Sequence, residues 1–225
     1  MDAEHFKSSL EALGVSLSQE QLERFGAFES ALYAANEVMN LTRVPIEECW
    51  RRHFLDSLLF QDLIPQNASV LDIGTGPGFP AWPLACARPD LNLTAIDSNG
   101  KMLRFLVTQP LPNLKVVTTR AEDWKERESF DYVTGRAVAP LPVQLEISAA
   151  FCRIGGLVVP MRAPSDREAI EATDLKPLGL KFERLVERQL PGTDIVRLFP
   201  VYMKTQRTQP GFPRKWAEIK RKALG

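Results

Sequence analysis

The sequence contains few residues that form disulfides or hold metals. Three of its 225 residues are cysteines, Cys49, Cys86 and Cys152, and two are histidines. No CxxC pair or cysteine–histidine cluster is present, which argues against a structural zinc site, and we expect no bound metal. An odd number of cysteines without a signal peptide indicates a reducing compartment. We therefore expect a cytoplasmic protein whose cysteines are small buried hydrophobes.

The sequence also lacks a net charge and a long apolar run. Lysine and arginine total 28, as do aspartate and glutamate, so the total charge does not indicate an anionic partner. No apolar stretch approaches the roughly 18 residues of a membrane helix, and we expect no membrane span. The charge is uneven, however, because residues 204–225 carry seven basic residues and one acidic residue. A basic tail favours a negatively charged partner, although a solvated C-terminal helix would have the same composition.

The first 65 or so residues have the periodicity of helices. Ser18 and Gln21 form a capping-box pattern ahead of an apolar helical face. A further helical stretch is predicted around residues 49–60. No parallel-strand pattern occurs before Ser69, so residues 1–65 are predicted to form a helical extension.

From Ser69 onward, short apolar runs alternate with helical patterns. This alternation is typical of a parallel sheet with helices on both faces. The predicted strands cover 70–73, 91–96, 114–118, 132–134 and 157–159, and the predicted helices cover 81–87, 101–108, 121–125, 141–151 and 166–173.

The last predicted strands differ from those before them. Two strand-like runs, 181–189 and 194–204, are joined by Pro191-Gly192, which is a hairpin signal. The predicted fold is therefore α/β, with a seven-stranded, mostly parallel, Rossmann-like sheet that ends in an antiparallel hairpin, as in class I methyltransferases. The predicted organisation is a helical extension (1–65), a methyltransferase domain (66–204) and a basic tail (205–225), in a chain that we expect to be a monomer.

A glycine-rich loop follows the first predicted strand, at Gly74, Gly76 and Gly78. Glycine permits positive φ and close approach of the backbone to a ligand, and ligands of such sheets bind at the carboxyl ends of the strands. The spacing G-x-G-x-G differs from the G-x-G-x-x-G of dinucleotide-binding proteins, and Asp72 in the strand would disfavour a diphosphate. These features favour S-adenosylmethionine, which carries no phosphate and has cationic amino and sulfonium groups.

Acidic residues after the next two strands strengthen this interpretation. Asp97 ends the second strand, where a carboxylate can accept hydrogen bonds from ribose hydroxyls. Glu122 follows the third strand, in a loop that commonly contacts the adenine edge. Each acid alone is also explained as a helix N-cap or a first-turn acid. Since Asp72, Asp97 and Glu122 fall at successive strand ends, we predict S-adenosylmethionine as the cofactor.

Three short segments are more particular than the glycine loop, namely Asn40-Leu-Thr42, His53-Phe-Leu-Asp-Ser-Leu58 and Arg136-Ala-Val-Ala-Pro-Leu141. Together with the loop and with Arg52, Asp97-Ser-Asn-Gly-Lys101 and Arg120-Ala-Glu-Asp123, they resemble the bacterial small-subunit ribosomal RNA guanine-N7 methyltransferases, the RsmG/GidB (glucose-inhibited division protein B) family. The resemblance covers nearly the whole chain. The sequence departs from the family pattern at Ala81, Met102 and Met161-Arg162, where a glycine, a basic residue and Lys-Gly are usual.

The resemblance implies methylation of N7 of one guanine in the 530 loop of 16S ribosomal RNA, as free RNA or within the small ribosomal subunit. N7 is nucleophilic and carries no proton, so we expect catalysis by proximity and orientation with no obligate general base. Arg136 is expected on the catalytic rim, in contact with the cofactor carboxylate or the substrate. The residues expected to bind the cofactor are Asp72, Gly74, Thr75, Gly76, Gly78, Phe79, Asp97, Ser98, Asn99, Ala121, Glu122 and Arg136.

RNA binding is expected from cations that neutralise phosphates. His53 and Asp56, three apart on one helical face, either approach the target or form a structural hydrogen bond between helix and sheet. Trp216 either stacks on a base or packs under the sheet. The predicted RNA-binding residues are Arg51, Arg52, Arg104, Arg207, Arg214, Lys215, Lys220, Arg221 and Lys222.

Two other classes of protein stay open. A small-molecule methyltransferase would carry a larger insertion over its pocket and would not need a basic tail. A non-catalytic RNA-binding protein would lack Asp97 or the glycine loop, and both are intact. Salt-sensitive RNA binding distinguishes the first class from the predicted enzyme, and cofactor affinity distinguishes the second.

Overall fold

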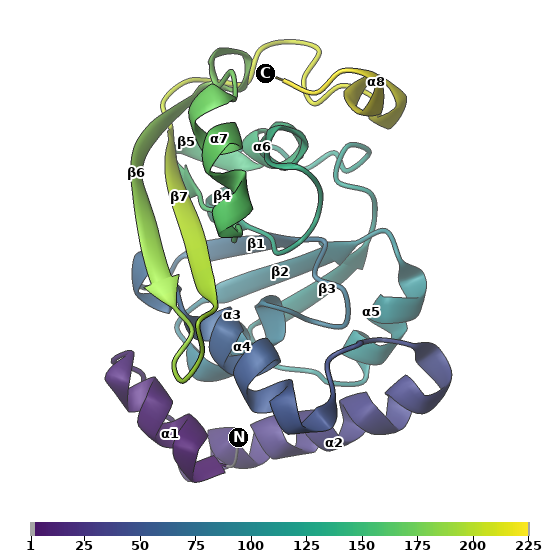
Figure 1. Cartoon of the computed structure of the whole chain (residues 1–225). Coiled ribbons are helices and arrows are strands. Elements are labelled where there is room, and N and C mark those ends of the chain that lie inside the picture. Colours follow the sequence, from purple (N-terminus) through teal and green to yellow (C-terminus); the bar gives the residue numbers. More distant parts are fainter. Residues whose placement is uncertain (1–2, 225) are drawn as a thin grey trace.

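The computed structural model describes residues 3–224 and contains one seven-stranded sheet with helices on both faces (Figure 1). The strand order is β3-β2-β1-β4-β5-β7-β6. Strands β1 to β5 pair in parallel, whereas β7 pairs antiparallel with both β5 and β6, which confirms the predicted fold. The strands are Ser69–Ile73 (β1), Asn92–Asp97 (β2), Leu114–Thr118 (β3), Phe130–Thr134 (β4), Cys152–Val158 (β5), Leu180–Gln189 (β6) and Val196–Lys204 (β7).

Helices cover the sheet on both sides because successive side chains of the central strands point to opposite faces. Val70 and Tyr132 pack in the core beneath α1, α2, α4 and α5, while Leu71 and Val133 pack in the core beneath α6 and α7. No described helix is long and apolar enough to cross a membrane. The helices are Ala3–Ala12 (α1), Gln19–Met39 (α2), Asp56–Leu58 (α3), Ala81–Ala87 (α4), Gly100–Val107 (α5), Leu141–Ala149 (α6), Arg167–Ala172 (α7) and Trp216–Arg221 (α8).

The start of α2 is fixed by the predicted capping box. Gln21 N donates to Ser18 Oγ at 3.2 Å, and Ser18 N donates to Gln21 Oε1 at 2.8 Å. The buried side of α2 packs onto α4, where the ring centroids of Phe28 and Trp82 are 4.2 Å apart. The N-terminal helices therefore share a hydrophobic core with the sheet.

One predicted helix, 121–125, is wrong, since residues 121–123 form a turn and residues 124 and 125 have no regular secondary structure. Trp124 N lies within hydrogen-bond distance of the carbonyls of Arg120 (3.1 Å) and Ala121 (3.3 Å), after which the chain extends. The Trp124 ring packs beside Phe130 and Phe151, with centroids 5.9 and 5.3 Å away. Burial of the indole outweighs the small gain from a five-residue helix, because helix formation needs a longer run. The turn leaves Ala121 and Glu122 at the carboxyl edge of the sheet.

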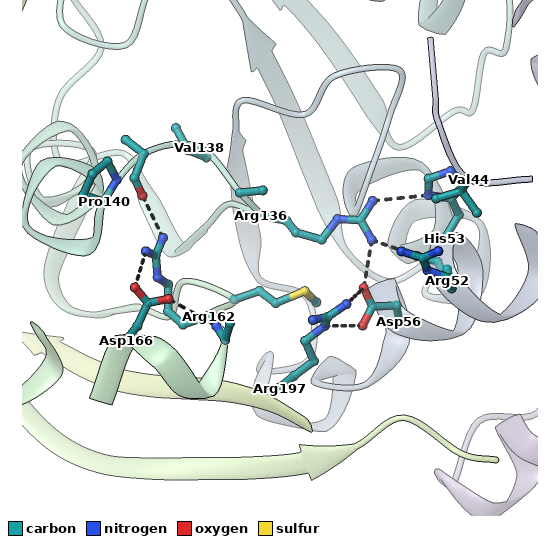
Figure 2. Close-up of a pocket in the computed structure, with 14 residues that line it drawn as sticks. Val44, Arg52, His53, Asp56, Arg136, Val138, Pro140, Arg162, Asp166 and Arg197 are labelled. Atoms are coloured by element: carbon teal, nitrogen blue, oxygen red, sulfur yellow. Dashed lines mark hydrogen bonds and ion pairs between the residues drawn. The ribbon is translucent and has the colours of Figure 1, made fainter. Parts of the chain in front are cut away.

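The stretch predicted as helical at 49–60 contains a π-helical segment, Trp50–Leu55, followed by α3. Such wide turns occur frequently at functional sites. The segment places His53 and Asp56 at the carboxyl edge of the sheet, where Figure 2 shows them facing Arg136.

The three cysteines are buried, which confirms that they pack as small hydrophobes. Burial raises the pKa of the Cys86 and Cys152 thiols to about 12. Both thiols are therefore protonated near neutral pH and are poor nucleophiles.

Candidate functional site

Two neighbouring cavities lie at the carboxyl edge of the parallel strands. The first, the β2 cavity, has a volume of about 280 Å³ and lies over the ends of β1 and β2. The second, the arginine cavity, has a volume of about 530 Å³ and is lined by four arginines (Figure 2). Ala137 and Val138, which follow β4, line both cavities. This edge is where open α/β sheets bind their ligands.

The glycine loop closes the β2 cavity on one side. Gly74, Gly76 and Gly78 have φ values of 70°, 58° and 121°, in the region that favours glycine. Gly74 N donates to Ile96 O at 2.8 Å, and Gly76 N donates to Asp97 Oδ2 at 2.8 Å. A Cβ atom on Gly78 would lie 2.7 Å from Leu106 Cδ1, so a side chain at this position would collide with α5. The loop therefore rests on the end of β2.

Five of the predicted cofactor-binding residues line the β2 cavity, namely Gly74, Asp97, Ser98, Ala121 and Glu122. Asp97 Oδ1 also accepts a hydrogen bond from Asn99 N at 2.7 Å, while Asn99 caps α5 by accepting from Lys101 N at 3.1 Å. Eight further residues line this cavity. Arg120, Ala137 and Val138 lie within two of the motifs, and Trp216 is the tail residue with two alternative predicted roles. No motif indicates the remaining four, Ile73, Ile96, Thr119 and Ile147.

The other predicted cofactor-binding residues support the loop or lie in the neighbouring cavity. Asp72 is fully buried, and its Oδ2 accepts a hydrogen bond from Ala81 N at the start of α4, at 3.1 Å. Burial raises the pKa of Asp72 to about 7. Phe79 is also buried and lines neither cavity, whereas Arg136 lines the arginine cavity. Thr75, Gly76, Gly78 and Asn99 line neither cavity, and their contacts with a cofactor stay predictions.

A buried carboxylate organises the arginine cavity. Asp56 is 1% exposed and accepts hydrogen bonds from Arg136 Nη1 at 3.0 Å and from Arg197 at 2.7 and 3.2 Å (Figure 2). Arg197 belongs to β7, so the predicted link between this helical segment and the sheet is confirmed. The pair of arginines is held in one geometry because both share a single desolvated anion.

His53 connects three of the sequence motifs. Its Nε2 lies 2.7 Å from Thr42 Oγ1, and its Nδ1 lies 3.5 Å from Arg136 Nη2. Its ring stacks on Phe79 with a centroid distance of 4.2 Å. Burial, followed by the nearby Arg136 charge, lowers the pKa of His53 to about 3. The imidazole is therefore neutral at physiological pH.

This depressed pKa gives a testable dependence of stability on pH. The unfolded chain binds one more proton than the folded chain between about pH 3 and the ordinary pKa of 6.5, so His53 destabilises the fold as the pH falls through that window. Substitution His53→Gln removes this effect. The test is urea unfolding of both proteins from pH 8 to pH 5. We expect the unfolding free energy of the wild type minus that of the variant to fall by about 1.4 kcal/mol for each pH unit below pH 6.5. Asp72 titrates in both proteins, so its contribution cancels in the difference between their unfolding free energies. A difference that stays constant with pH would contradict a neutral, buried His53.

The opposite wall of the arginine cavity is held by Arg162. Its Nη1 donates to Ala139 O and to Gln144 Oε1, each at 2.8 Å. Its Nη2 donates to Asp166 Oδ1 at 3.0 Å (Figure 2). Arg52 is exposed at the mouth of the cavity. The cavity thus combines four guanidinium groups with two carboxylates, those of Asp56 and Asp166, and has a cationic excess.

The predicted RNA-binding residues occupy different environments. Arg51 pairs with Glu48 at 3.2 Å, and Arg214 is held by the buried Glu146 at 2.6 Å. Arg207 is 83% exposed, although it lies 3.6 Å from Glu128. The others lie on the surface or the cavity mouth with exposed side chains: Arg52, Arg104, Lys215, Lys220, Arg221 and Lys222.

The chain is similar to known ribosomal RNA methyltransferases. The family model described as rRNA small subunit methyltransferase G matches residues 21–192. Proteins named ribosomal RNA small subunit methyltransferase G include one from Clostridium beijerinckii, 37% identical with 92% of each chain covered. Another, from Lactobacillus johnsonii, is 34% identical with all of each chain covered.

Solved structures with little sequence identity share the fold. A SAM-dependent methyltransferase from Aquifex aeolicus has a TM-score of 0.56 at 14% identity, covering 76% of this chain and 97% of its own. A TehB-like SAM-dependent methyltransferase from Corynebacterium glutamicum has a TM-score of 0.55 at 15% identity, covering 78% and 98%. The family model matches most of the chain. The two cavities lie at the edge of the sheet where class I folds bind their ligands. The chain therefore belongs to the rRNA small subunit methyltransferase G family, whose members are enzymes that use S-adenosylmethionine as methyl donor.

Proposed function

We propose that this enzyme methylates N7 of a guanine in the 530 loop of 16S ribosomal RNA, with the cofactor in the β2 cavity and the guanine in the arginine cavity. The observation that carries the proposal is that Ala137 and Val138 line both cavities, so a ligand in either cavity would border the same two residues. Ala137 has a φ of 54°, an uncommon conformation for a residue with a side chain. Strained backbone conformations of this kind cluster at active sites and ligand-binding sites.

The residues of the β2 cavity fit S-adenosylmethionine. Asp97 and Glu122 offer carboxylate oxygens to ribose hydroxyls and to the adenine amino group, and neither acid repels a cationic ligand. A Cβ atom on Gly74 would lie 3.0 Å from Val138 Cγ2, so glycine at this position lets Val138 pack directly against the loop at the edge of the cavity. Asp72 holds the end of the loop through Ala81 N, and Asn99 donates to Asp97 from the start of α5. We propose that Thr75, Gly76, Gly78 and Phe79 shape the loop around the cofactor. When bound, the cofactor supplies an electrophilic methyl group.

The arginine cavity fits a target atom that needs no deprotonation. His53 has a pKa of about 3 and its ring nitrogens face Thr42 and Arg136, while Asp56 is shared by two arginines. Neither group is free to accept a proton from a substrate. Guanine N7 carries a lone pair and no proton, so correct placement is sufficient for its methylation. A target with an N–H or O–H group would require a base.

The cationic excess of this cavity fits RNA. Guanidinium groups donate to phosphate oxygens and to guanine O6, the acceptor next to N7. Asp56 and Asp166 neutralise part of the charge, which limits repulsion of the cationic methylated base. We propose that exposed cations outside the cavity extend the RNA-binding surface, namely Arg104, Arg207, Lys215, Lys220, Arg221 and Lys222.

A methyl-transfer assay tests this function. The purified enzyme and methyl-labelled S-adenosylmethionine are incubated with 16S RNA or small subunits from cells that lack the modification, with 23S RNA as the control. We expect label on one guanine of the 530 loop, in at least one of the two 16S substrates, at a site cleaved by the borohydride and aniline treatment specific for N7-methylguanine. Label on another atom or another loop, or no label on either substrate, would contradict the proposal.

A further inference from the structure

The C-terminal segment returns to the site after the last strand. β7 ends at Lys204, and residues 205–215 lead to α8, which lies beside α6 in Figure 1. The first residue of α8, Trp216, lines the β2 cavity next to Ile147 of α6. The segment therefore contributes a wall to a cavity whose acidic residues, Asp97 and Glu122, lie about a hundred residues earlier in the chain.

A buried ion pair fixes this segment on the domain. The Glu146 side chain of α6 is fully buried, and its Oε1 accepts from Arg214 N and Nε, each at 2.9 Å, while its Oε2 accepts from Arg214 Nη2 at 2.6 Å. A buried carboxylate with three donors is strongly held, and loss of one partner leaves an uncompensated charge. Arg214 lies two residues before Trp216, so the pair determines where the indole is placed.

Apolar packing fixes the other side of Trp216. Ile219, one helical turn later, is fully buried in the core beneath α6, and Trp216 and Phe212 pack against the same core. Lys215, Lys220 and Arg221 are exposed. The helix thus turns its indole towards the β2 cavity and its cations towards solvent, which favours a contact inside the cavity over stacking on an RNA base.

We propose that Trp216 is a cofactor-binding residue carried by the C-terminal segment, and that Glu146 and Arg214 are its positioning pair. The inference rests on the proposed location of the cofactor in the β2 cavity. Ile96, Ile147 and Trp216 give that cavity apolar lining, and Asp97 and Glu122 add carboxylates to it. Adenine fits such a lining, because its flat ring can stack on an aromatic side chain and its amino group can donate to a carboxylate.

Binding of S-adenosylhomocysteine, measured by calorimetry without RNA, tests the role of the indole. We expect Trp216→Ala to weaken binding about tenfold, the magnitude of a lost base–aromatic contact, and Trp216→Phe to stay within about threefold of wild type. In methyl-transfer assays, KM for S-adenosylmethionine should rise while kcat changes less.

Substitution Asp97→Asn distinguishes failure of this inference from failure of the cavity assignment. If Asp97→Asn weakens binding and Trp216→Ala leaves it within twofold of wild type, the cavity is correct and the role of Trp216 is wrong. If neither variant changes the affinity, the cofactor does not occupy the β2 cavity. An effect of Trp216→Ala on RNA affinity alone would assign the indole to RNA and overturn the inference.

Tryptophan fluorescence provides a readout that a purely structural role would not change. The chain has four tryptophans, and we expect S-adenosylhomocysteine to alter the emission of the wild type but not that of Trp216→Phe. Trp124→Phe is the matched control, because Trp124 packs on the same core without lining the cavity. A full ligand-induced change in Trp216→Phe would contradict the contact.

A double-mutant cycle tests the positioning pair. Substitution Glu146→Gln should weaken S-adenosylhomocysteine binding several-fold in the wild-type background and add little in the Trp216→Ala background, because the pair acts through the indole. Additive losses in the two backgrounds would show that Glu146 does not act through Trp216. Thermal unfolding of each variant identifies any that fails to fold, and Trp216→Phe then still tests the contact through its fluorescence.

Discussion

Replacing Asp97 with alanine should weaken binding of S-adenosylmethionine about 100-fold. In the unliganded chain, Asp97 accepts hydrogen bonds from Gly76 N at 2.8 Å and Asn99 N at 2.7 Å while lining the β2 cavity. The substitution removes the acceptor proposed for the ribose and releases the glycine loop. Hydrogen bonds to charged groups are worth about 1.5–3 kcal/mol each, so loss of one or two of them corresponds to roughly two orders of magnitude in affinity.

Calorimetry with S-adenosylmethionine measures this loss, and Asp123→Ala is the matched control. Asp123 lies in the turn after β3 next to Glu122, but its side chain is exposed and it does not line the cavity. We expect the control to stay within twofold of wild type. An Asp97→Ala protein that binds as tightly as the control would show that the ribose is held elsewhere.

Replacing Asp56 with alanine should reduce methylation of RNA at least 100-fold and destabilise the fold by about 3–5 kcal/mol. The substitution leaves Arg136 and Arg197 facing each other without the buried anion that they share. Breaking a buried ion pair by removing one partner has this effect because a charge is left uncompensated. The two guanidinium groups would also separate, which disturbs the cavity proposed for the guanine.

Urea unfolding and methyl-transfer rates measure both effects, with affinity for S-adenosylhomocysteine as a check that the β2 cavity is intact. Glu48→Ala is the matched control, because the Glu48–Arg51 pair is partly exposed and should contribute less than about 1 kcal/mol. Full activity and unchanged stability in the Asp56 variant would show that the arginine cavity takes no part in the reaction.

Local patterns were sufficient to predict most of the helices and strands and the position of the glycine loop. The capping box of Ser18 and Gln21, the Pro191-Gly192 hairpin and the glycines after β1 each depend on neighbouring residues, and each is present in the structure. The acid at the end of β2 could also be placed, because all parallel strands end at the same edge. The turn at Ala121 could not be predicted, because it depends on the packing of the Trp124 ring against Phe130 and Phe151.

The arginine cavity and the tail contact depend on packing between distant parts of the chain. Arg197 lies 141 residues after Asp56, and its approach depends on the register of the hairpin, which no local pattern encodes. Charge alone predicts Arg214 as one of the RNA-binding cations, and its pair with Glu146 could not be predicted because the sequence does not show that Glu146 is buried. The stacking of Phe79 on His53, which lies about 25 residues earlier in the chain, could not be predicted because no local pattern encodes it, and the contact of Phe79 with the cofactor stays a prediction.

A crystal structure of the enzyme with S-adenosylmethionine tests the central claim most directly, because it locates both the ligand and its reactive methyl group. We predict the ribose at Asp97, the adenine between Trp216 and the turn of Ala121 and Glu122, and the methyl group directed past Ala137 and Val138 into the arginine cavity. A cofactor bound in the arginine cavity, or one whose methyl group faces away from it, would contradict the proposed arrangement of the two ligands.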